Sequence, residues 1–214
     1  MALASPVELL VPHTLRVLGH ASHRRIASLR SLDPAVVESQ LEDDRALGLV
    51  TRSELGATRT WHLTERGKAK GESDLAAELD RSGGRRTVTE AHTAFLVLNR
   101  RIGTVMTEWQ LRPTPTDELA ANDHRDAAHD DAVVRRLSRL GRDLRPITER
   151  LTSVLQRFDM HQPRIDAALN RVEGGEDSWV DSPEVASVNI VWIQLHEDLL
   201  ATLGIPRGED DPGV

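Results

Sequence analysis

The sequence predicts a mainly α-helical protein, in which a small α+β domain with one β-hairpin is followed by an all-α helical bundle. Short amphipathic segments separated by turn residues, together with two strand-like segments, predict the first domain. Longer segments with apolar residues at alternating spacings of three and four predict the bundle. We therefore divide the 214 residues into residues 1–82, residues 87–205 and a disordered, acidic tail at residues 206–214.

Three short helices are predicted before the hairpin. Each begins at a residue that favours a helix N-terminus, either a side-chain oxygen at the N-cap or a proline in the first turn. Each ends at a residue that favours a turn. These start and stop residues are Pro12 and Gly19, then Ser22 and Ser31, then Asp33 and Gly48.

Two strands follow at residues 49–54 and 58–63, with a turn at residues 55–57 between them. Thr64 is expected to cap a further helix. The resulting order of helix, helix, turn, helix, strand, wing, strand and helix is that of a winged helix-turn-helix domain. A generic small α+β domain without a role on DNA is the alternative that this order leaves open.

The second half is predicted to be helical. Residues 82–86 form the linker, Thr87 opens a capping box, Pro146 kinks or divides the second long helix, and Pro183 begins the last helix. The apolar seam positions are Val88, Ala91, Phe95, Leu98, Ile102, Val105 and Trp109, then Val133, Leu137, Leu140, Leu144, Ile147, Leu151, Val154 and Phe158, then Val185, Val188, Trp192, Leu195 and Leu199.

The three seams need apolar partners. A monomeric bundle can supply all of them. We prefer the alternative, a two-fold dimer that shares at least one seam, because paired half-sites increase the specificity of DNA-binding proteins.

Composition excludes several classes of protein. The absence of cysteine excludes a disulfide scaffold, a cysteine nucleophile and a thiolate zinc site, and it fits a reducing compartment. No apolar run reaches the length of a membrane span, and residues 1–11 lack the pattern of a secretory signal. We therefore expect a soluble, cytoplasmic protein with no membrane partner.

The formal net charge of −7 argues against a protein that coats nucleic acid by bulk electrostatics. The charge is uneven, since residues 1–84 carry a net −1 and residues 85–214 a net −6. A nearly neutral domain can still bind DNA if its cations share one face.

In a helix-turn-helix domain, the first turns of the second of its two helices contact base edges in the major groove. The third predicted helix offers such positions here. Its acidic residues repel phosphates and weaken this interpretation, but flanking arginines can hold the DNA backbone. The candidate DNA-binding residues are Arg24, Arg25, Glu38, Ser39, Gln40, Arg45, Arg52 and Arg59.

Residues 26–67, with LGLV at residues 47–50 and WHLTERG at residues 61–67, resemble MarR-like winged-helix regulators. The resemblance implies a homodimer that binds a palindromic operator with an affinity that a small ligand alters. The acidic third helix departs from the polar or basic reading face of that family. The second half resembles an uncharacterised actinobacterial group of winged-helix regulators in LNR at residues 98–100, EWQLR at 108–112, NDH at 122–124 and LHEDLL at 195–200.

Some polar residues of the helical domain could form an effector pocket, namely Asn99, Trp109, His124, Trp192 and His196. The alternative is that the tryptophans fill the core and find hydrogen-bond partners there. Residues 122–130 and 196–198 hold possible metal ligands, but their spacing matches no zinc motif, so we expect capping and surface roles and no metal.

A basic stripe at Arg135, Arg139 and Arg142 is expected to be a solvated face, with anion binding as the alternative. No phosphate-binding glycine loop and no serine-nucleophile motif is present, so we expect no enzyme, no catalytic residue and no cofactor.

These observations predict a homodimeric, sequence-specific transcription regulator that binds double-stranded DNA and responds to a small ligand or a partner at its helical domain. The alternative is a winged-helix module that binds a partner enzyme and not DNA.

Overall fold

The computed structural model describes residues 2–55, 58–206 and 208–209. The chain is mainly helical with one small antiparallel sheet, as expected. Residues 56–57 of the predicted turn and most of the predicted tail lie outside the described ranges. Within those ranges, no helix combines the length and the apolar character of a membrane span.

The described residues divide into two compact units. The first comprises Met1–Thr89, Leu151–Met160 and Gln194–Val214, and the second comprises Glu90–Arg150 and His161–Ile193. This division differs from the predicted one, because two segments from the second half of the sequence pack with the first domain. The periodicity of a helix indicates which face is buried but not which segment covers it.

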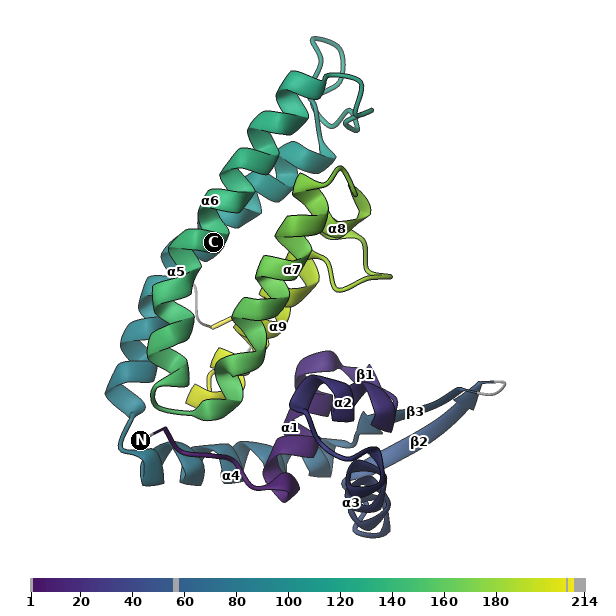
Figure 1. Ribbon diagram of the computed structural model, residues 1–214, viewed down its shortest axis with the longest axis vertical. Coiled ribbons are helices and arrows are strands. Elements are labelled where there is room, and N and C mark those ends of the chain that lie inside the picture. Colours follow the sequence, from purple (N-terminus) through teal and green to yellow (C-terminus); the bar gives the residue numbers. More distant parts are fainter. Residues whose placement is uncertain (1, 56–57, 207, 210–214) are drawn as a thin grey trace. The chain divides into compact units, whose positions relative to one another are not determined.

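The first unit begins with a compact arrangement of helices and strands (Figure 1). Its elements are α1 (Val7–Leu18), β1 (His20–Ala21), α2 (His23–Arg30), α3 (Pro34–Ala46), β2 (Val50–Leu55), β3 (Thr58–Leu63) and α4 (Glu65–Ser82), joined later in the chain by the 3-10 helix η1 (Gln156–Met160) and the C-terminal part of α9 (Val188–Leu203).

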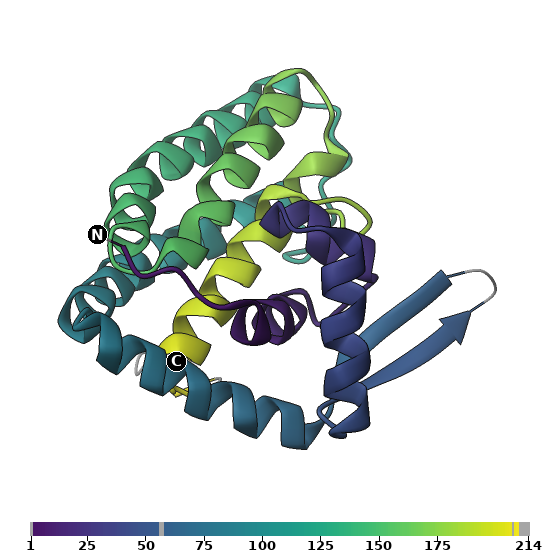
Figure 2. The same cartoon turned by 60° about the horizontal axis from the view of Figure 1, so that its bottom comes forward.

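The sheet has the strand order β1-β3-β2, and both pairings are antiparallel. Ala21 and Arg52 lie opposite Trp61 on its two sides. β1 was not predicted, because two residues are too few to show the alternation that indicates a strand. Figure 2 shows β2 and β3 extending beyond α3 as a hairpin.

The predicted N-caps at Ser22, Asp33 and Thr64 are confirmed. Their side-chain oxygens accept hydrogen bonds from the backbone N–H groups of Arg25, Ala35 and Gly67, respectively. The core beneath them is apolar and includes Leu15, Ile26, Val37, Leu41 and Trp61.

Several predicted helix boundaries are wrong. α1 begins at Val7 and contains Pro12, because Leu9 and Val11 are buried and extend the apolar face in front of the proline. α5 (Arg85–Gln110) begins two residues before the predicted capping box at Thr87.

The predicted start of the last helix at Pro183 is also wrong. A short α8 (Ser178–Asp181) precedes it, and α9 begins only at Val188, after a turn in which the Ser182 side chain accepts from the Glu184 N–H. A serine before a proline is as typical of a turn as of a helix start.

In the second unit, α5 and α6 (Ala127–Thr152) run side by side in opposite directions (Figure 1). Ion pairs between Arg101 and Asp143, at 3.2 Å, and between Arg136 and Glu108 define this direction. α7 (His161–Glu173) packs on α6, where a Cβ at Gly141 would meet Leu169. α6 continues through Pro146, so this proline does not divide the helix, and the alternative, a kink at Pro146, stays a prediction.

The predicted seam positions are buried, apart from Val154 and Val185, which are half-buried. A single chain therefore covers them, and the seams do not require a second copy. The dimer stays a prediction for which the seams no longer provide an argument.

Candidate nucleic-acid interface

The α2–turn–α3 segment is held by local interactions at each end. Ser31 ends α2 in the left-handed conformation, with φ of 54°, and Asp33 caps α3 two residues later. Val37 and Leu41 anchor α3 to the core, so Ser39 lies on the exposed face of the helix, with Glu38 partly exposed beside it.

The predicted arginines of this face do not stand alone. Six side chains from α3, β2 and β3 form a chain of alternating charge, which we call the surface ion-pair chain. Its N···O distances are 2.7 Å for Arg45–Glu42, 2.8 Å for Glu42–Arg52, 3.4 Å for Arg52–Glu54, 3.5 Å for Glu54–Arg59 and 3.9 Å for Arg59–Glu38.

The surface ion-pair chain is electrically neutral, because it contains three arginines and three glutamates. The hydrogen bond from Arg45, together with the charges of both neighbouring arginines, holds the pKa of Glu42 below its usual value. A phosphate that binds Arg45, Arg52 or Arg59 must therefore compete with a glutamate. Each exposed ion pair stabilises the folded protein by only about 0–1 kcal/mol, so replacing a glutamate with a phosphate costs little free energy.

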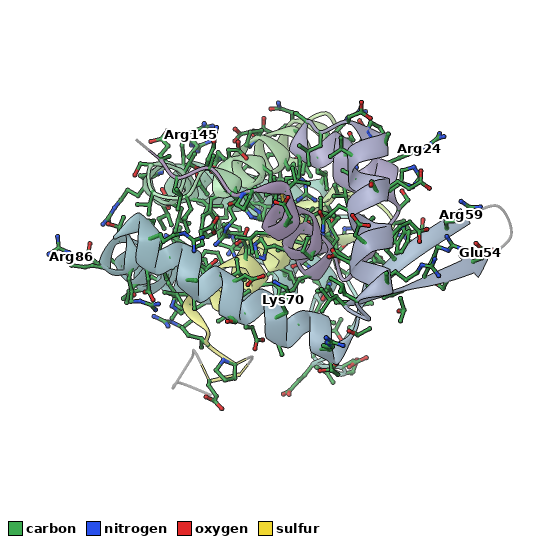
Figure 3. The ribbon with its side chains drawn as sticks, turned by 90° about the horizontal axis from the view of Figure 1, so that it is seen from below. Arg24, Glu54, Arg59, Lys70, Arg86 and Arg145 are labelled. Atoms are coloured by element: carbon green, nitrogen blue, oxygen red, sulfur yellow. The ribbon has the colours of Figure 1, made fainter. Side chains whose placement is uncertain are left out.

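The same unit also has exposed arginines that no carboxylate pairs with. Among the described residues, Arg24, Arg25 and Arg66 take part in no ion pair, and all three are exposed. Figure 3 shows Arg24 pointing outward on the same side of the protein as Arg59 and Glu54. Arg24 and Arg25 lie in the first turn of α2, a usual place for phosphate contacts in a helix-turn-helix domain.

Gln40 forms a hydrogen bond within α3. Its amide donates to Asp44 Oδ1 at 3.0 Å, and Asp44 is buried at the helix position where the spacing favours an apolar residue. Burial raises the pKa of Asp44, against the opposing effect of the Gln40 hydrogen bond. Base reading by Gln40 stays a prediction, and it would require the release of Asp44.

The same unit contains a buried ion-pair network that was not predicted from the sequence. The fully buried Arg157 of η1 donates through Nε to Glu78 at 2.9 Å, through Nη1 to Asp198, and through Nη2 to Thr202 at 2.7 Å. His13 Nε2 lies 2.9 Å from Asp198 Oδ1. This network links α1, α4, η1 and α9.

One signal could have indicated this network. Glu78 lies between Leu75 and Leu79 on α4, so helical spacing places it on the buried face. Asp198 stands in the same relation to Leu195 and Leu199. A carboxylate on an apolar face needs a buried cation, but neither helix indicates that Arg157 supplies it.

The structure joins the predicted effector residues of the second unit in two pairs. Trp192 Nε1 donates to Asn99 Oδ1 at 3.0 Å, and the Trp109 and His124 rings lie 4.4 Å apart. Ten residues of helix, about 15 Å, separate Asn99 from Trp109. His196 belongs to the first unit. The single shared pocket stays a prediction.

The polar residues after α5 hold one another in place. Asn122 donates to Trp109 O at 3.0 Å and to Asp130 Oδ1 at 2.9 Å, and His129 Nε2 lies 3.0 Å from Glu108 O. Within residues 2–55, 58–206 and 208–209, no three His, Cys, Asp or Glu side chains are grouped so that they could hold a metal ion. Arg135, Arg139 and Arg142 are exposed on α6.

Comparisons with protein-family models, with curated proteins and with solved structures find no match to this chain.

Proposed function

We propose that this protein is a DNA-binding transcription regulator and that residues 1–82 form a winged helix-turn-helix domain. The observation that carries the proposal is the order α1-β1-α2-α3-β2-β3 together with the sheet order β1-β3-β2. In such a domain the second helix of the α2–turn–α3 segment enters the major groove and the hairpin lies against the backbone.

In this proposal, Ser39 and Glu38 reach base edges from the exposed turns of α3. Arg24, Arg25 and Arg66 bind phosphates directly. Arg52 and Arg59 do so after phosphates replace Glu42, Glu54 and Glu38 in the surface ion-pair chain. Each phosphate contact releases a counterion, so the affinity falls steeply with salt.

Fluorescence anisotropy tests the proposal, with labelled duplexes from the region upstream of the protein's own gene and with random duplexes at about 50 and 200 mM salt. The Arg52→Ala/Arg59→Ala variant should weaken binding to all duplexes and reduce the salt slope by about two. The Glu38→Gln/Glu42→Gln variant should strengthen binding to random duplexes, because two competitors of phosphate are removed, and should weaken the preference for a duplex whose bases Glu38 reads. Lys70→Gln, which removes an exposed cation paired with Asp74, is the control.

We also propose a homodimer whose two α3 helices bind half-sites about 34 Å apart on a palindromic operator, and modulation of its affinity by a small ligand or a partner protein. Light scattering with and without the selected duplex measures the mass. A complex that contains one 23.7 kDa chain per operator would contradict the dimer.

The neutral surface ion-pair chain favours a second candidate function, a module that binds a partner protein and not DNA. The same titrations separate the two functions. If the wild-type protein binds no duplex at low salt and the Glu38→Gln/Glu42→Gln variant binds none either, the regulator proposal fails. The interaction module then takes its place.

A further inference from the structure

The second unit contains a groove between α5 and α6, which run side by side (Figure 1), and no step of the proposed function uses it. Its volume is about 250 Å³. Each helix contributes residues at positions i, i+3 and i+4, which share one helix face. The lining residues are Arg101, Thr104, Val105, Arg136, Arg139 and Leu140, and all six belong to the second unit.

The groove is positively charged. Among the residues that the structure describes, its lining contains three arginines and no carboxylate. Arg135 and Arg142 are also exposed on α6. Residues 85–214 as a whole carry a net charge of −6, so the cations of an acidic half of the chain are concentrated here. A cleft lined by charges of one sign raises the local concentration of the opposite ion.

Two ion pairs between the helices hold the outer arginines in place. Arg101 Nη1 donates to Asp143 at 3.2 Å, and Arg136 Nη2 donates to Glu108. Neither of these carboxylates lines the groove. A guanidinium group has five N–H donors, so both arginines keep donors that these bonds do not use. Because the side chains are already held, binding a ligand costs less side-chain entropy.

Arg139 has no carboxylate partner. It lies between Arg136 and Asp143 along α6, and it takes part in no ion pair within the described part of the chain. The side chains of Arg101 and Arg136 are 49% and 42% exposed, and Arg139 is exposed as well. A dissolved ligand can therefore reach all three arginines.

We propose that this groove binds a phosphate group, either as free phosphate or as part of a small phosphomonoester. A phosphomonoester offers three acceptor oxygens and a charge of about −1.5 to −2 near neutral pH. It can therefore accept hydrogen bonds from three arginines at once, and the planar fork of a guanidinium group matches its oxygens. A carboxylate has one charge and two oxygens, and it satisfies fewer of these donors.

The dimensions of the groove favour a small ligand over a long polyanion. Sites for drug-sized ligands have volumes of about 300–1,000 Å³, and this groove is smaller. The ion pairs of Arg101 and Arg136 lie on either side of Thr104 and Arg139 along the two helices. The space between them suits one anionic group.

A larger cavity in the first unit, of about 600 Å³, is a poorer anion site. Its arginine, Arg16, donates to Glu72 at 2.9 Å and to Glu197 at 3.0 Å, and both carboxylates line that cavity. They would repel a bound phosphate. The phosphate site is therefore assigned to the groove of the second unit.

Phosphorus NMR titration of the full chain with inorganic phosphate and with glycerol phosphate tests the site, at about 150 mM sodium chloride so that weak long-range attraction is screened. We expect a dissociation constant of about 1 mM or below for at least one of the two. Acetate, added as a competitor, should bind at least about tenfold more weakly.

Three variants locate the site. Arg139→Gln should weaken phosphate binding about fivefold to tenfold, because it removes charge-assisted hydrogen bonds, and it should leave the unfolding temperature unchanged. Arg142→Gln is the matched control, since it removes another exposed α6 arginine that does not line the groove, and it should change the affinity less than about twofold. Asp143→Asn should strengthen binding about twofold to threefold, because it removes a competitor for Arg101.

No phosphate binding up to about 10 mM, equal losses in Arg139→Gln and Arg142→Gln, or acetate binding as tight as that of phosphate would each overturn the site. Binding of inorganic phosphate alone identifies the free ion as the ligand, and tighter binding of glycerol phosphate identifies a phosphomonoester; both results support the groove.

The duplex titrations separate this site from the proposed function, on which it does not rest. Arg139→Gln should leave duplex affinity unchanged. A loss of duplex binding as large as the loss of phosphate binding would assign the groove to nucleic acid and overturn the small-ligand site. If the wild-type protein binds phosphate but no duplex, the proposed function fails and the phosphate site stands.

Discussion

Arg157 is fully buried and uses all three guanidinium nitrogens in hydrogen bonds to side chains of other elements. Burying a charge is costly, and only complete pairing offsets that cost. The intact ion pairs of Arg157 therefore add little net stability to the protein. Removing either partner is strongly destabilising, because it leaves the other charge buried and unpaired.

The Arg157→Met variant leaves Glu78 and Asp198 buried without their cation. We expect it to lower the free energy of unfolding by about 3–5 kcal/mol, as measured by urea denaturation. Arg145→Met is the matched control, because Arg145 lies on the surface (Figure 3) and its ion pair with Asp166 is largely exposed, so its loss should cost less than about 1 kcal/mol. Equal losses in the two variants would contradict this view of the buried network.

His13 should make stability depend on pH. Burial lowers its pKa to about 4, because desolvation outweighs the attraction of Asp198. The unfolded chain, with an ordinary pKa of 6.5, therefore binds more protons than the folded chain between these two values. Stability should fall as the pH drops below 6.5, by up to about 1.4 kcal/mol per pH unit.

Urea midpoints of the wild-type protein and of His13→Gln at several pH values between 6.5 and 5 check this prediction. The difference between the two proteins should change in favour of the variant as the pH falls, because glutamine cannot take up the proton. A difference that stays constant over this range would show that His13 does not titrate as its burial predicts.

At the scale of elements, hydrogen bonds of Thr64 join the start of α4 to the short loop between α3 and β2. Thr64 Oγ1 accepts from the Gly67 N–H at 3.0 Å and donates to Gly48 O at 2.8 Å, while the Thr64 N–H donates to Leu49 O. Gly67 permits this approach because a Cβ there would lie 2.0 Å from Leu49 O. This junction sets the direction in which α4 leaves the hairpin.

The Gly67→Ala variant should therefore destabilise the protein by about 2 kcal/mol or more, since a backbone atom must move to admit the methyl group. Gly71→Ala on the same helix is the control, because nothing lies within 4 Å of its added Cβ. That variant should stabilise the protein by about 0.5–1 kcal/mol. Thermal unfolding followed by circular dichroism measures both, and a stabilised Gly67→Ala would contradict the close approach.

At the scale of the whole molecule, the first compact unit is assembled from three separate parts of the chain. The hydrogen bonds of Arg157 span 79 residues to Glu78 and 41 residues to Asp198. Leu9 and Leu75 also share a buried cluster with Ala201. Residues 1–82 thus have a core that later segments complete.

A fragment of residues 1–82 should not unfold as the full chain does. Without residues 151–160 and 194–206, His13 and Glu78 lose their partners and the Leu9–Leu75 cluster is uncovered. We expect a midpoint at least about 10 °C lower, or no cooperative transition. Calorimetry of the fragment and the full chain provides the comparison, and equal midpoints would support the domain boundary predicted from the sequence.

Local interactions made much of the fold predictable. The caps at Ser22, Asp33 and Thr64 depend on a side chain and a backbone group within three residues of each other. The seams follow from the period of a helix, which places the same face inward whatever covers it. For these reasons the hairpin, the long helices and most of the buried apolar residues were predicted. The boundaries expected at Pro12 and Pro183 were wrong, because packing at the first and turn formation at the second prevailed over the local preference for a helix start.

The candidate site was predictable only in part, because local interactions determine its elements but not the pairing of its charges. The sequence by itself determined which residues lie on α3 and the hairpin, because that follows from local order. Only the tertiary structure decided that Arg52 and Arg59 meet Glu42, Glu54 and Glu38, that Arg157 lies between Glu78 and Asp198, and that Arg30 donates to Thr14 Oγ1 and Arg157 O. Charge pairing depends on distance in space, and segments far apart in the chain have no local signal that records which of them will meet.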